Sequence, residues 1–246
     1  YLNADKGNYN QISQVVFLFN NIEVYTDNEE KLVSDEAIIE LKKDTITLLS
    51  NVKYENQNNE VFTLNQIHSN KVIVIKNHSQ IKSNIDGDAL ITNVKNFNIG
   101  VKTADCVPIL FADCDQKIVG AIHAGWRGTY NLIVLEVLDV IRKDFNISFN
   151  KIFFSIGPYI QKCCFEVGEE IWNSFRDKFH EYSKPFIRIK AKYFLDLGLL
   201  NYLILRSNGV INIDMVKSCT KCNPDYYSYR REKKSGLNQI SNIKLN

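Results

Sequence analysis

The sequence predicts a single α/β domain with a mixed β-sheet, and three observations support this. Short apolar segments bounded by polar turns are typical of strands. They alternate with longer segments in which apolar residues recur at helical spacing. Several neighbouring strands are joined by short polar turns, which predicts hairpins and therefore antiparallel pairs within the sheet. No repeat and no linker rich in Gly, Ser or Pro divides the chain, so we expect one domain over 1–246.

The N-terminal part predicts one helix followed by strands. Ser34 is placed to cap a helix through residue 50, with acidic residues in its first turn and an apolar side. Residues 61–68 and 71–76 predict the two strands of a hairpin, with His68 at the bend. Further strands are predicted at 86–93 and 99–106.

A second hairpin is predicted to place a cysteine beside a histidine. Residues 107–112 and 117–122 are apolar strands joined by a short polar loop. If the loop is centred between residues 114 and 115, opposed residues have numbers that sum to 229, which pairs Cys106 with His123. Directly opposed residues of an antiparallel pair project to the same face, with Cα atoms about 4.5 to 5.5 Å apart. The thiol and the imidazole are therefore expected to share one site.

The C-terminal half alternates helices and strands. A turn over residues 124–129 leads into a helix that begins near Thr129, and Asn208-Gly209 is expected to close the last helix. Strands are predicted at 151–158 and 210–216, helices at 130–144, 166–180 and 194–207, and a polar tail follows.

The composition is that of a globular protein and argues against several functional classes. Hydrophobic residues make up 45% and charged residues 24% of the chain, close to ordinary values. A net charge of +2 gives no reason to expect a nucleic-acid partner. The longest apolar runs are far shorter than the roughly 20 residues that span a bilayer. No membrane association is therefore expected.

Cysteine usage and the first residues favour a cytoplasmic location. The chain does not begin with the basic start, apolar stretch and small-residue cleavage site of a signal peptide. The six cysteines could form three disulfides, but dense disulfide frameworks belong to small secreted domains without a large core. We therefore expect reduced thiols.

Two imidazoles and one thiol form the main candidate site. His68 lies at the end of one predicted hairpin, and His123 lies beside Cys106 at the end of the other. Two nitrogens and one sulfur suit zinc, and three protein ligands with an open fourth position are typical of a catalytic zinc site. The same cysteine and histidine also fit nucleophilic catalysis by a thiolate. Copper is a third interpretation, although multi-copper electron transfer needs more than the four histidines present.

Two charged residues beside this set are candidates for substrate and proton chemistry. Arg127 lies in a glycine-flanked turn before a helix, where it would either bind an anion or form an ordinary ion pair. Asp105 directly precedes Cys106. Its carboxylate could orient a ligand or act as general acid or base, whereas a carboxylate that ends a loop is more often a turn or cap residue.

The C-terminal motifs carry weaker signals. Cys219 and Cys222 form a single CxxC, whereas a structural zinc ion needs four ligands. Cys163-Cys164 could complete such a site, but adjacent cysteines rarely both face one metal, so the sequence favours buried small thiols. The tyrosines beside Arg230 could stack on a base or sugar-linked ligand, or belong to a strand that packs its tyrosines.

These residues lie in blocks that resemble the YfiH family, also described as laccase-domain or polyphenol-oxidase-like proteins and as purine nucleoside phosphorylases. The most specific blocks are HAGWRG at 123–128 and TADC at 103–106. The resemblance implies a mixed α/β sandwich related to the catalytic domain of cytotoxic necrotizing factors, with His68, Cys106 and His123 as zinc ligands. Further matching blocks are NQIHS at 65–69, DGDALIT at 86–92, IGPYIQKCCFEVGEE at 156–170 and CTKCNPDYYSYRREKKSG at 219–236.

The resemblance also implies an activity, namely phosphorolysis of adenosine, inosine or guanosine and methylthioadenosine, together with deamination of adenosine. The open zinc position would then orient phosphate or water, and Arg127 would offset phosphate charge. Cys106, His123 and Asp105 would take the other catalytic roles. The alternatives are a Cys106–His123 hydrolase of amide or peptidoglycan-precursor substrates, a copper-dependent polyphenol oxidase, and a non-catalytic metal-binding or partner-binding descendant.

Departures from the family pattern concern substrate contacts. Ser69 follows the first metal histidine where the family usually has Gly, and Leu41-Lys42 stands where members commonly have Asn-Arg. The expected basic contact is then carried by Lys42 or absent. Gly236-Leu237 stands in place of a common Gly-Arg, and the first 30 residues show no clear Gly-Gly-Val-Ser block. The metal residues are intact, and Lys42, Arg127 and Arg230 are the expected substrate contacts.

Overall fold

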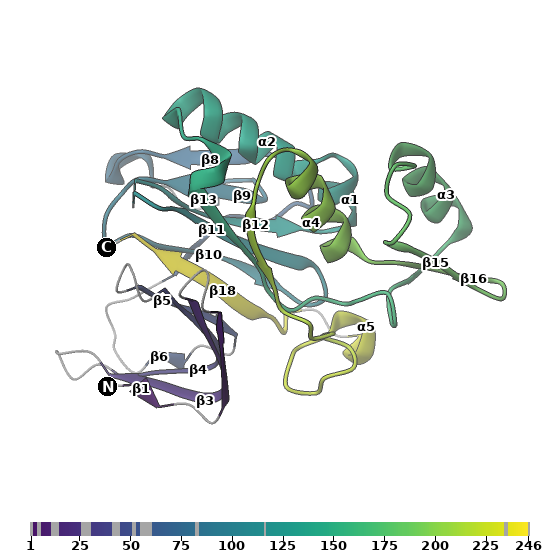
Figure 1. The fold of residues 1–246 in the computed structure, drawn as a ribbon, viewed down its shortest axis with the longest axis horizontal. Helices are drawn as coiled ribbons and strands as arrows, with labels where there is room; N and C mark the ends of the chain where they lie inside the picture. Colours follow the sequence, from purple (N-terminus) through teal and green to yellow (C-terminus); the bar gives the residue numbers. More distant parts are fainter. Residues whose placement is uncertain are drawn as a thin grey trace.

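A computed structural model describes residues 61–245 apart from 82–83, 116 and 234–235, together with the backbone of six strands within 1–54. Those six strands pair antiparallel in one sheet, drawn in purple in Figure 1. They are β1 Leu2–Asn3, β2 Lys6–Asn10, β3 Val15–Tyr25, β4 Lys31–Glu40, β5 Thr45–Ser50 and β6 Lys53–Tyr54.

The central sheet has six strands in the order β17-β13-β11-β12-β9-β8. The three pairings that join β13, β11, β12 and β9 are antiparallel, whereas β13 with β17 and β8 with β9 are parallel. The predicted α/β class with a mixed sheet is therefore confirmed. The bounds are β8 Val72–Ile75, β9 Ala89–Thr92, β11 Val107–Asp113, β12 Val119–Ala124, β13 Ile152–Ile156 and β17 Asn212–Met215.

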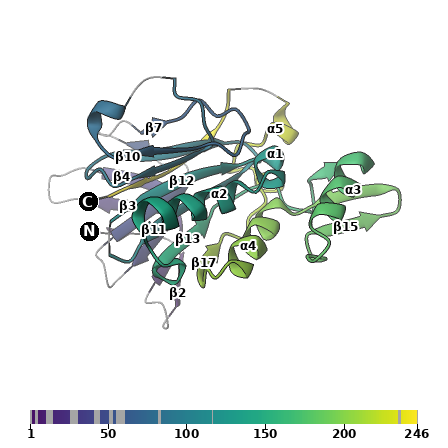
Figure 2. The same cartoon turned by 90° about the horizontal axis from the view of Figure 1, so that it is seen from above.

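Helices cover one face of the central sheet and a second sheet covers the other (Figures 1 and 2). The covering helices are α1 Trp126–Tyr130, α2 Ile133–Val140 and α4 Leu197–Ser207. The second sheet has the order β18-β10-β7, with β7 Phe62–Thr63, β10 Asn98–Thr103 and β18 Gln239–Lys244. β5 of the N-terminal sheet lies beside β18.

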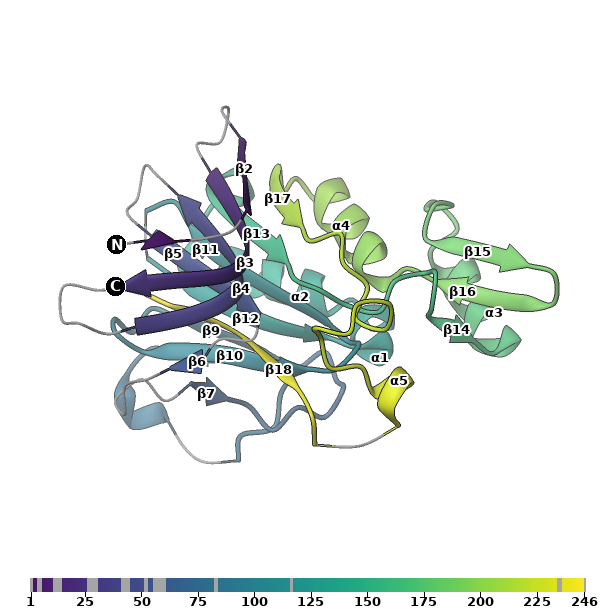
Figure 3. The ribbon, with the colours of Figure 1, turned by 90° about the horizontal axis from the view of Figure 1, so that it is seen from below.

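A smaller unit projects from one end of the molecule (Figure 3). Its three strands pair antiparallel in the order β14-β16-β15, and a helix packs on them. The ring of Phe175 lies 5.2 Å from the ring of Tyr130, which joins this helix to the main body. The elements are β14 Glu166–Val167, α3 Glu169–Lys178, β15 Phe186–Ile189 and β16 Lys192–Leu195.

Shorter helical segments complete the described part of the chain. A π-helical segment, Ile141–Phe145, continues α2, and α5 Tyr229–Glu232 precedes β18. Two 3-10 turns lie at His78–Gln80 and Phe149–Lys151. None of the helices in the described ranges is long and apolar enough to span a membrane.

The alternating packing of β11 explains its unbroken apolar sequence. Ile109 and Phe111 face the core beneath the helices, whereas Leu110 faces the core between the two sheets. All three side chains are buried. A strand that is buried on both faces loses the polar alternation of a half-exposed strand, and burying a side chain of this size contributes roughly 1.5 to 3 kcal/mol.

Two predictions in the N-terminal half are wrong. The helix predicted over 34–50 is instead β4 and β5, which pair antiparallel. The β-branched run at 45–47 suits an extended backbone, and pairing with β3 outweighs the capping signal of Ser34.

The hairpin predicted over 61–76 does not form either. β7 pairs parallel with β10 in the second sheet, whereas β8 pairs parallel with β9 in the central sheet. The connecting segment passes between sheets, with Asn65 bridged to Asp86. His68 nevertheless lies in a bend, with φ of 59°. A turn signal identifies a change of direction but does not identify which strands pair.

The C-terminal half contains the predicted helices and strands in the predicted order with shifted boundaries, but the strands β14, β15 and β16 of the small unit were not predicted. The helix predicted from Thr129 begins at Trp126 and is interrupted at Leu132, whose φ of 61° is left-handed. Asp196 caps α4 by accepting the N–H of Leu199 at 3.0 Å, and Gly209 follows its end with φ of 88°. The polar tail contains β18, which the sequence analysis missed.

Candidate metal centre

His68, Cys106 and His123 converge on one point. Their ligand atoms all lie within 4.8 Å of one another. The Cys106 Sγ lies 3.9 Å from His68 Nε2, and the two imidazole rings meet edge to face at a centroid separation of 4.8 Å. The structure therefore brings together the three residues that were predicted as metal ligands.

The hairpin that joins Cys106 and His123 forms, but with a different register. Pro108 is the residue opposite His123, and Val107 is opposite Ala124. The opposed numbers sum to 231 instead of 229, because the turn is centred one residue later than predicted. A shift of two in the sum keeps each side chain on its face of the sheet. Cys106, just before β11, therefore still reaches His123.

Asp88 orients two parts of the site. Its Oδ1 lies 2.8 Å from His123 Nδ1 and accepts the backbone N–H of His68 at 2.9 Å. Its Oδ2 accepts the N–H of Ser69 at 2.6 Å and the Ser69 hydroxyl at 2.7 Å. A carboxylate behind a histidine fixes the ring orientation and leaves Nε2 for a metal. Ser69, a departure from the usual glycine, thus adds a bond to Asp88.

Asp88 is the functional residue that sequence reasoning missed. It is fully buried and lies one residue before β9. A carboxylate directly before a mainly apolar strand is the signal that could have identified it, because buried carboxylates are nearly always paired.

Two glycines of the HAGWRG block make room for the site. A Cβ at Gly125 would lie 2.9 Å from His68 Cδ2 and 3.3 Å from Cys106 Sγ. A Cβ at Gly128 would lie 2.8 Å from the carbonyl oxygen of Ser69. Both distances to His68 and Ser69 are shorter than normal contacts. The glycines therefore allow the start of α1 to pack against the bend that carries His68.

Hydrogen bonding sets the protonation of the site. Burial alone would raise the pKa of Cys106, but its bonds with His123 and His68 lower that pKa to about 7. Burial opposes the charged form of His123, but Asp88 and Cys106 raise its pKa to about 9. Burial also opposes ionisation of Asp88, yet its bonds with His123 and Ser69 keep its pKa below the ordinary value. A thiolate beside an imidazolium is the resulting pair.

The donor set fits a metal ion with an accessible side. One sulfur and two imidazole nitrogens are zinc ligands, and three such ligands are typical of catalytic sites. His123 is buried, Cys106 is half-buried and His68 is exposed. Solutes can therefore approach from the side of His68.

Asp105 holds the loop beside Cys106 and has its carboxylate fully engaged. Its Oδ1 accepts the Thr220 hydroxyl at 2.7 Å, and its Oδ2 accepts the backbone N–H of Arg230 at 2.7 Å. Its carbonyl oxygen accepts the N–H of Ile160 at 3.0 Å. The residue has a left-handed φ of 88°. These contacts tie the residue before Cys106 to two distant segments.

The predicted substrate contacts have different surroundings. Arg127 is exposed, its guanidinium lies 4.4 Å from the centre of the Trp126 ring, and no carboxylate in the described ranges pairs with it. The Arg230 side chain donates to the carbonyl of Glu166 at 2.9 Å and lies over the ring of Phe165. Lys42 lies outside the described residues.

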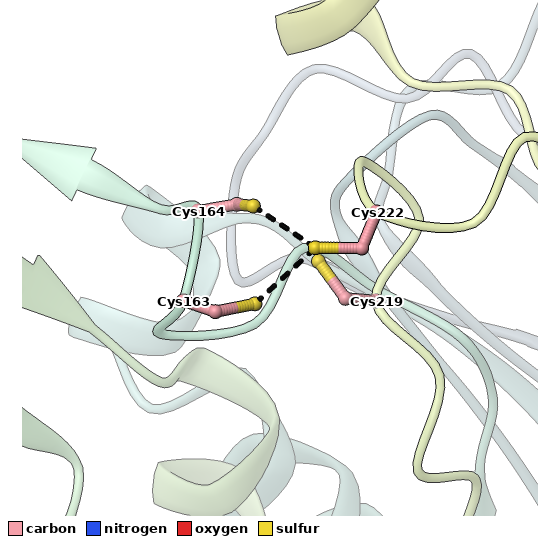
Figure 4. Close-up of side chains that lie close together, drawn as sticks. All are labelled: Cys163, Cys164, Cys219 and Cys222. Carbon is pink, nitrogen blue, oxygen red and sulfur yellow. Dashed lines mark hydrogen bonds between the residues drawn. The ribbon is translucent and has the colours of Figure 1, made fainter.

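The two cysteine pairs also come together, contrary to the expectation of separate buried thiols. The Sγ atoms of Cys163, Cys164, Cys219 and Cys222 all lie within 4.8 Å of one another (Figure 4). Only Cys219 is buried. The tyrosines of this region lie before and within α5 and not in a strand, with Tyr226 buried and Tyr229 exposed.

Comparison with known proteins identifies the family. The family model described as multi-copper polyphenol oxidoreductase laccase matches residues 33–246. The crystal structure of the Bacillus licheniformis hypothetical protein YfiH is similar with a TM-score of 0.70 and 28% identity, covering 76% of this chain and 74% of that chain. A Neisseria meningitidis protein of family DUF152 gives a TM-score of 0.68 and 32% identity, covering 76% and 75%. The chain therefore belongs to this laccase-like YfiH family.

Relatives in the family carry enzyme names. A purine nucleoside phosphorylase of Clostridium acetobutylicum is 35% identical over 187 residues, which cover 75% of this chain and 76% of the relative. A purine nucleoside phosphorylase of Borreliella burgdorferi is 30% identical over 214 residues, covering 84% and 92%. Adenosine deaminase RL5, from an unknown prokaryotic organism, is 34% identical over 178 residues, covering 68% of each chain.

Proposed function

We propose that the protein is a zinc-dependent purine nucleoside phosphorylase that also deaminates adenosine. The observation that carries this proposal is the convergence of His68, Cys106 and His123 in front of the Asp88 carboxylate. One thiolate and two imidazoles backed by a carboxylate suit a catalytic zinc ion. The names of the relatives supply the substrate class, purine nucleosides with phosphate or water.

The residues of the centre have distinct proposed roles. His68, Cys106 and His123 would hold zinc, which would supply a Lewis-acidic position for phosphate or water. Arg127 is exposed and free of carboxylate partners in the described ranges, so its guanidinium would offset phosphate charge. Asp105 would fix the loop of Cys106, since both of its carboxylate oxygens already accept hydrogen bonds.

Substrate contacts beyond the metal are proposed on the basic side chains. Arg230 presents a guanidinium close to Phe165, and its backbone N–H is bound to Asp105. Lys42 is the candidate that replaces the arginine common in the family. The partners we propose are small molecules, and we propose a cytoplasmic location, in keeping with six cysteines that form no disulfide.

A cysteine hydrolase is the second candidate function. The Cys106 pKa of about 7 and the adjacent His123 favour a thiolate nucleophile acting on an amide. Such an enzyme needs no stoichiometric metal. A copper-dependent polyphenol oxidase, suggested by the family description, would need two or more bound copper ions.

One experiment separates these functions. The purified protein is incubated with adenosine with and without phosphate, while adenine, ribose 1-phosphate and inosine are followed and bound metals are measured. We expect adenine and ribose 1-phosphate only with phosphate, and inosine in both conditions. Cys106→Ala should abolish both activities and the zinc bound at this centre, whereas Cys114→Ser, which removes a thiol of the β11–β12 turn, should retain them. Full activity of Cys106→Ala with normal zinc would contradict the proposal.

A further inference from the structure

The four cysteines of the second cluster are arranged as two facing pairs. Cys163 and Cys164 lie in the turn before β14, and Cys219 and Cys222 lie in the loop after β17. The Sγ of Cys222 lies 3.3 Å from that of Cys164 and 3.7 Å from that of Cys163. Figure 4 shows all four sulfur atoms directed toward the same space.

The sulfur separations suit a single tetrahedral metal ion. With zinc–sulfur bonds of about 2.3 Å, two sulfurs of a tetrahedron lie about 3.8 Å apart. The two measured separations of 3.3 and 3.7 Å are close to that value, and no pair exceeds 4.8 Å. A disulfide bond needs sulfurs at about 2.05 Å, so these pairs are too far apart to be bonded.

The backbone around Cys219 is shaped for a thiolate. The N–H of Gln161 donates to the Cys219 Sγ at 3.4 Å. The N–H groups of Cys222 and Asn223 both donate to the Cys219 carbonyl, at 3.1 and 2.9 Å, which closes the CxxC into a turn. Backbone donors aimed at a sulfur stabilise its ionised form, and the turn brings both CxxC sulfurs to one side.

Arg231 holds the CxxC loop from behind. Its guanidinium donates to the carbonyl oxygens of Thr220 at 2.9 Å, Lys221 at 3.2 Å and Asn223 at 3.1 Å. It also donates to the carbonyl of Tyr226. The loop therefore has its shape set by protein contacts, which lowers the entropy that a metal ion must overcome in ordering its ligands.

We propose that Cys163, Cys164, Cys219 and Cys222 bind one structural zinc ion. This is a closed site with four protein ligands, in contrast to the three ligands of the first centre. It joins the segment before β14 to the loop after β17, two parts of the chain that also meet through the bridge between Tyr159 and Cys219 and through the bond from the Gln161 N–H to the Cys219 Sγ.

The proposed ion also supports the loop of the first centre. Thr220, between the two CxxC cysteines, donates its hydroxyl to Asp105, and Asp105 precedes Cys106. Ile160, just before the other cysteine pair, donates its N–H to the Asp105 carbonyl. Loss of the second zinc ion should therefore loosen the position of Cys106 without removing a ligand of the first centre.

The test measures zinc in one variant that empties the first centre and in a second variant that empties both sites. In Cys106→Ala we expect about one zinc ion per chain, bound by sulfur ligands alone at about 2.3 Å in X-ray absorption. Cys106→Ala combined with Cys222→Ser should bind none, and Cys106→Ala combined with Cys114→Ser, the matched cysteine control, should keep the ion. The zinc content of Cys106→Ala is measured without any activity assay. If the proposed function is wrong, this test of the second site therefore still holds.

Thiol labelling of the folded Cys106→Ala protein gives a second measurement that needs no further substitution. Before chelation we expect the four cysteines of the cluster to resist alkylation, and after removal of zinc all four should react. The thermal unfolding midpoint should fall on chelation. Absence of zinc, iron in its place, an intramolecular disulfide found by mass spectrometry, or four thiols that react without chelation would each overturn the proposal.

Discussion

The buried carboxylate of Asp88 contacts His123 Nδ1 at 2.8 Å and also accepts the backbone N–H of His68 at 2.9 Å. One side chain thus aligns the ring of one proposed ligand and fixes the bend that carries another. The three converging residues come from a bend, a strand start and a strand end, and Asp88 connects the first of these to the last.

Replacing Asp88 by asparagine should weaken metal binding. An amide oxygen can still accept from the His68 and Ser69 N–H groups, but it no longer stabilises a charged or strongly polarised His123 ring. We expect zinc affinity to fall about 10- to 100-fold, the range for partners of metal-bound histidines, with a parallel loss of activity. Competition with a calibrated chelator measures the affinity.

Asp113→Asn is the matched control for that variant. Asp113 is also buried and accepts the N–H groups of Asp115, Lys117 and Ile118 in the β11–β12 turn. Its replacement should lower the free energy of unfolding while zinc affinity stays at the wild-type value. Equal losses of affinity in both variants would show that Asp88 acts only through stability.

Gly125→Ala should disturb the centre directly. The added Cβ would lie 2.9 Å from His68 Cδ2, so the imidazole must move. We expect a drop of at least tenfold in zinc affinity and activity, measured by chelator competition and product formation. Gly168→Ala is the control, because a Cβ there meets nothing within 4 Å. Wild-type binding by the Gly125 variant would contradict the close packing around His68.

Alkylation of Cys106 in the metal-free protein should report its pKa of about 7. Above pH 7 the thiolate predominates and the rate with iodoacetamide approaches its plateau, while well below pH 7 the rate falls about tenfold per pH unit as the sulfur is protonated. His123 should stay protonated until about pH 9. His68→Ala removes one bond that lowers the Cys106 pKa, so the midpoint should move upward. An unperturbed midpoint near 8.5 in the wild type would reject the thiolate–imidazolium pair.

Gly198→Ala should destabilise the fold through Tyr159. The new Cβ would lie 2.2 Å from the Tyr159 ring, which is buried and donates to Asp196 at 2.7 Å. Alanine gains up to about 1 kcal/mol over glycine in a helix, but overpacking costs about 1 to 3 kcal/mol. Urea unfolding should therefore show a net loss of stability. A gain of stability would mean that the ring has room to shift.

The parts of the centre that sequence predicts are those set by short-range geometry. Cys106 and His123 flank one hairpin, and a hairpin brings its ends together whichever of two registers it adopts. His68 was predicted at a bend, and it lies in one although its predicted hairpin does not form. To predict the role of Asp88, one would need to know which strand lies beside β12. That strand is β9, and the pairing forms only in the assembled sheet.

Features that depend on contacts between distant segments were predicted less well, because local sequence does not show which segments meet. The two cysteine pairs are separated by more than 50 residues, and only the assembled fold shows that they face each other. The polar sequence of β18 gives no alternating signal, yet its backbone pairs with β10 along its whole length. The 34–50 segment has local features of a helix, and pairing with β3 overrides them.

The contacts of Asp105 have a consequence for how the protein is made. Thr220 and Arg230, which bind its carboxylate, are synthesised long after His68, Cys106 and His123. β10, which ends at Thr103, pairs with β7 on one edge and with β18 on the other, so the second edge also waits for the end of the chain. A nascent chain on the ribosome therefore carries all three proposed metal ligands before the groups that hold the loop of Cys106 exist. Maturation of the centre has to follow the emergence of the last strand.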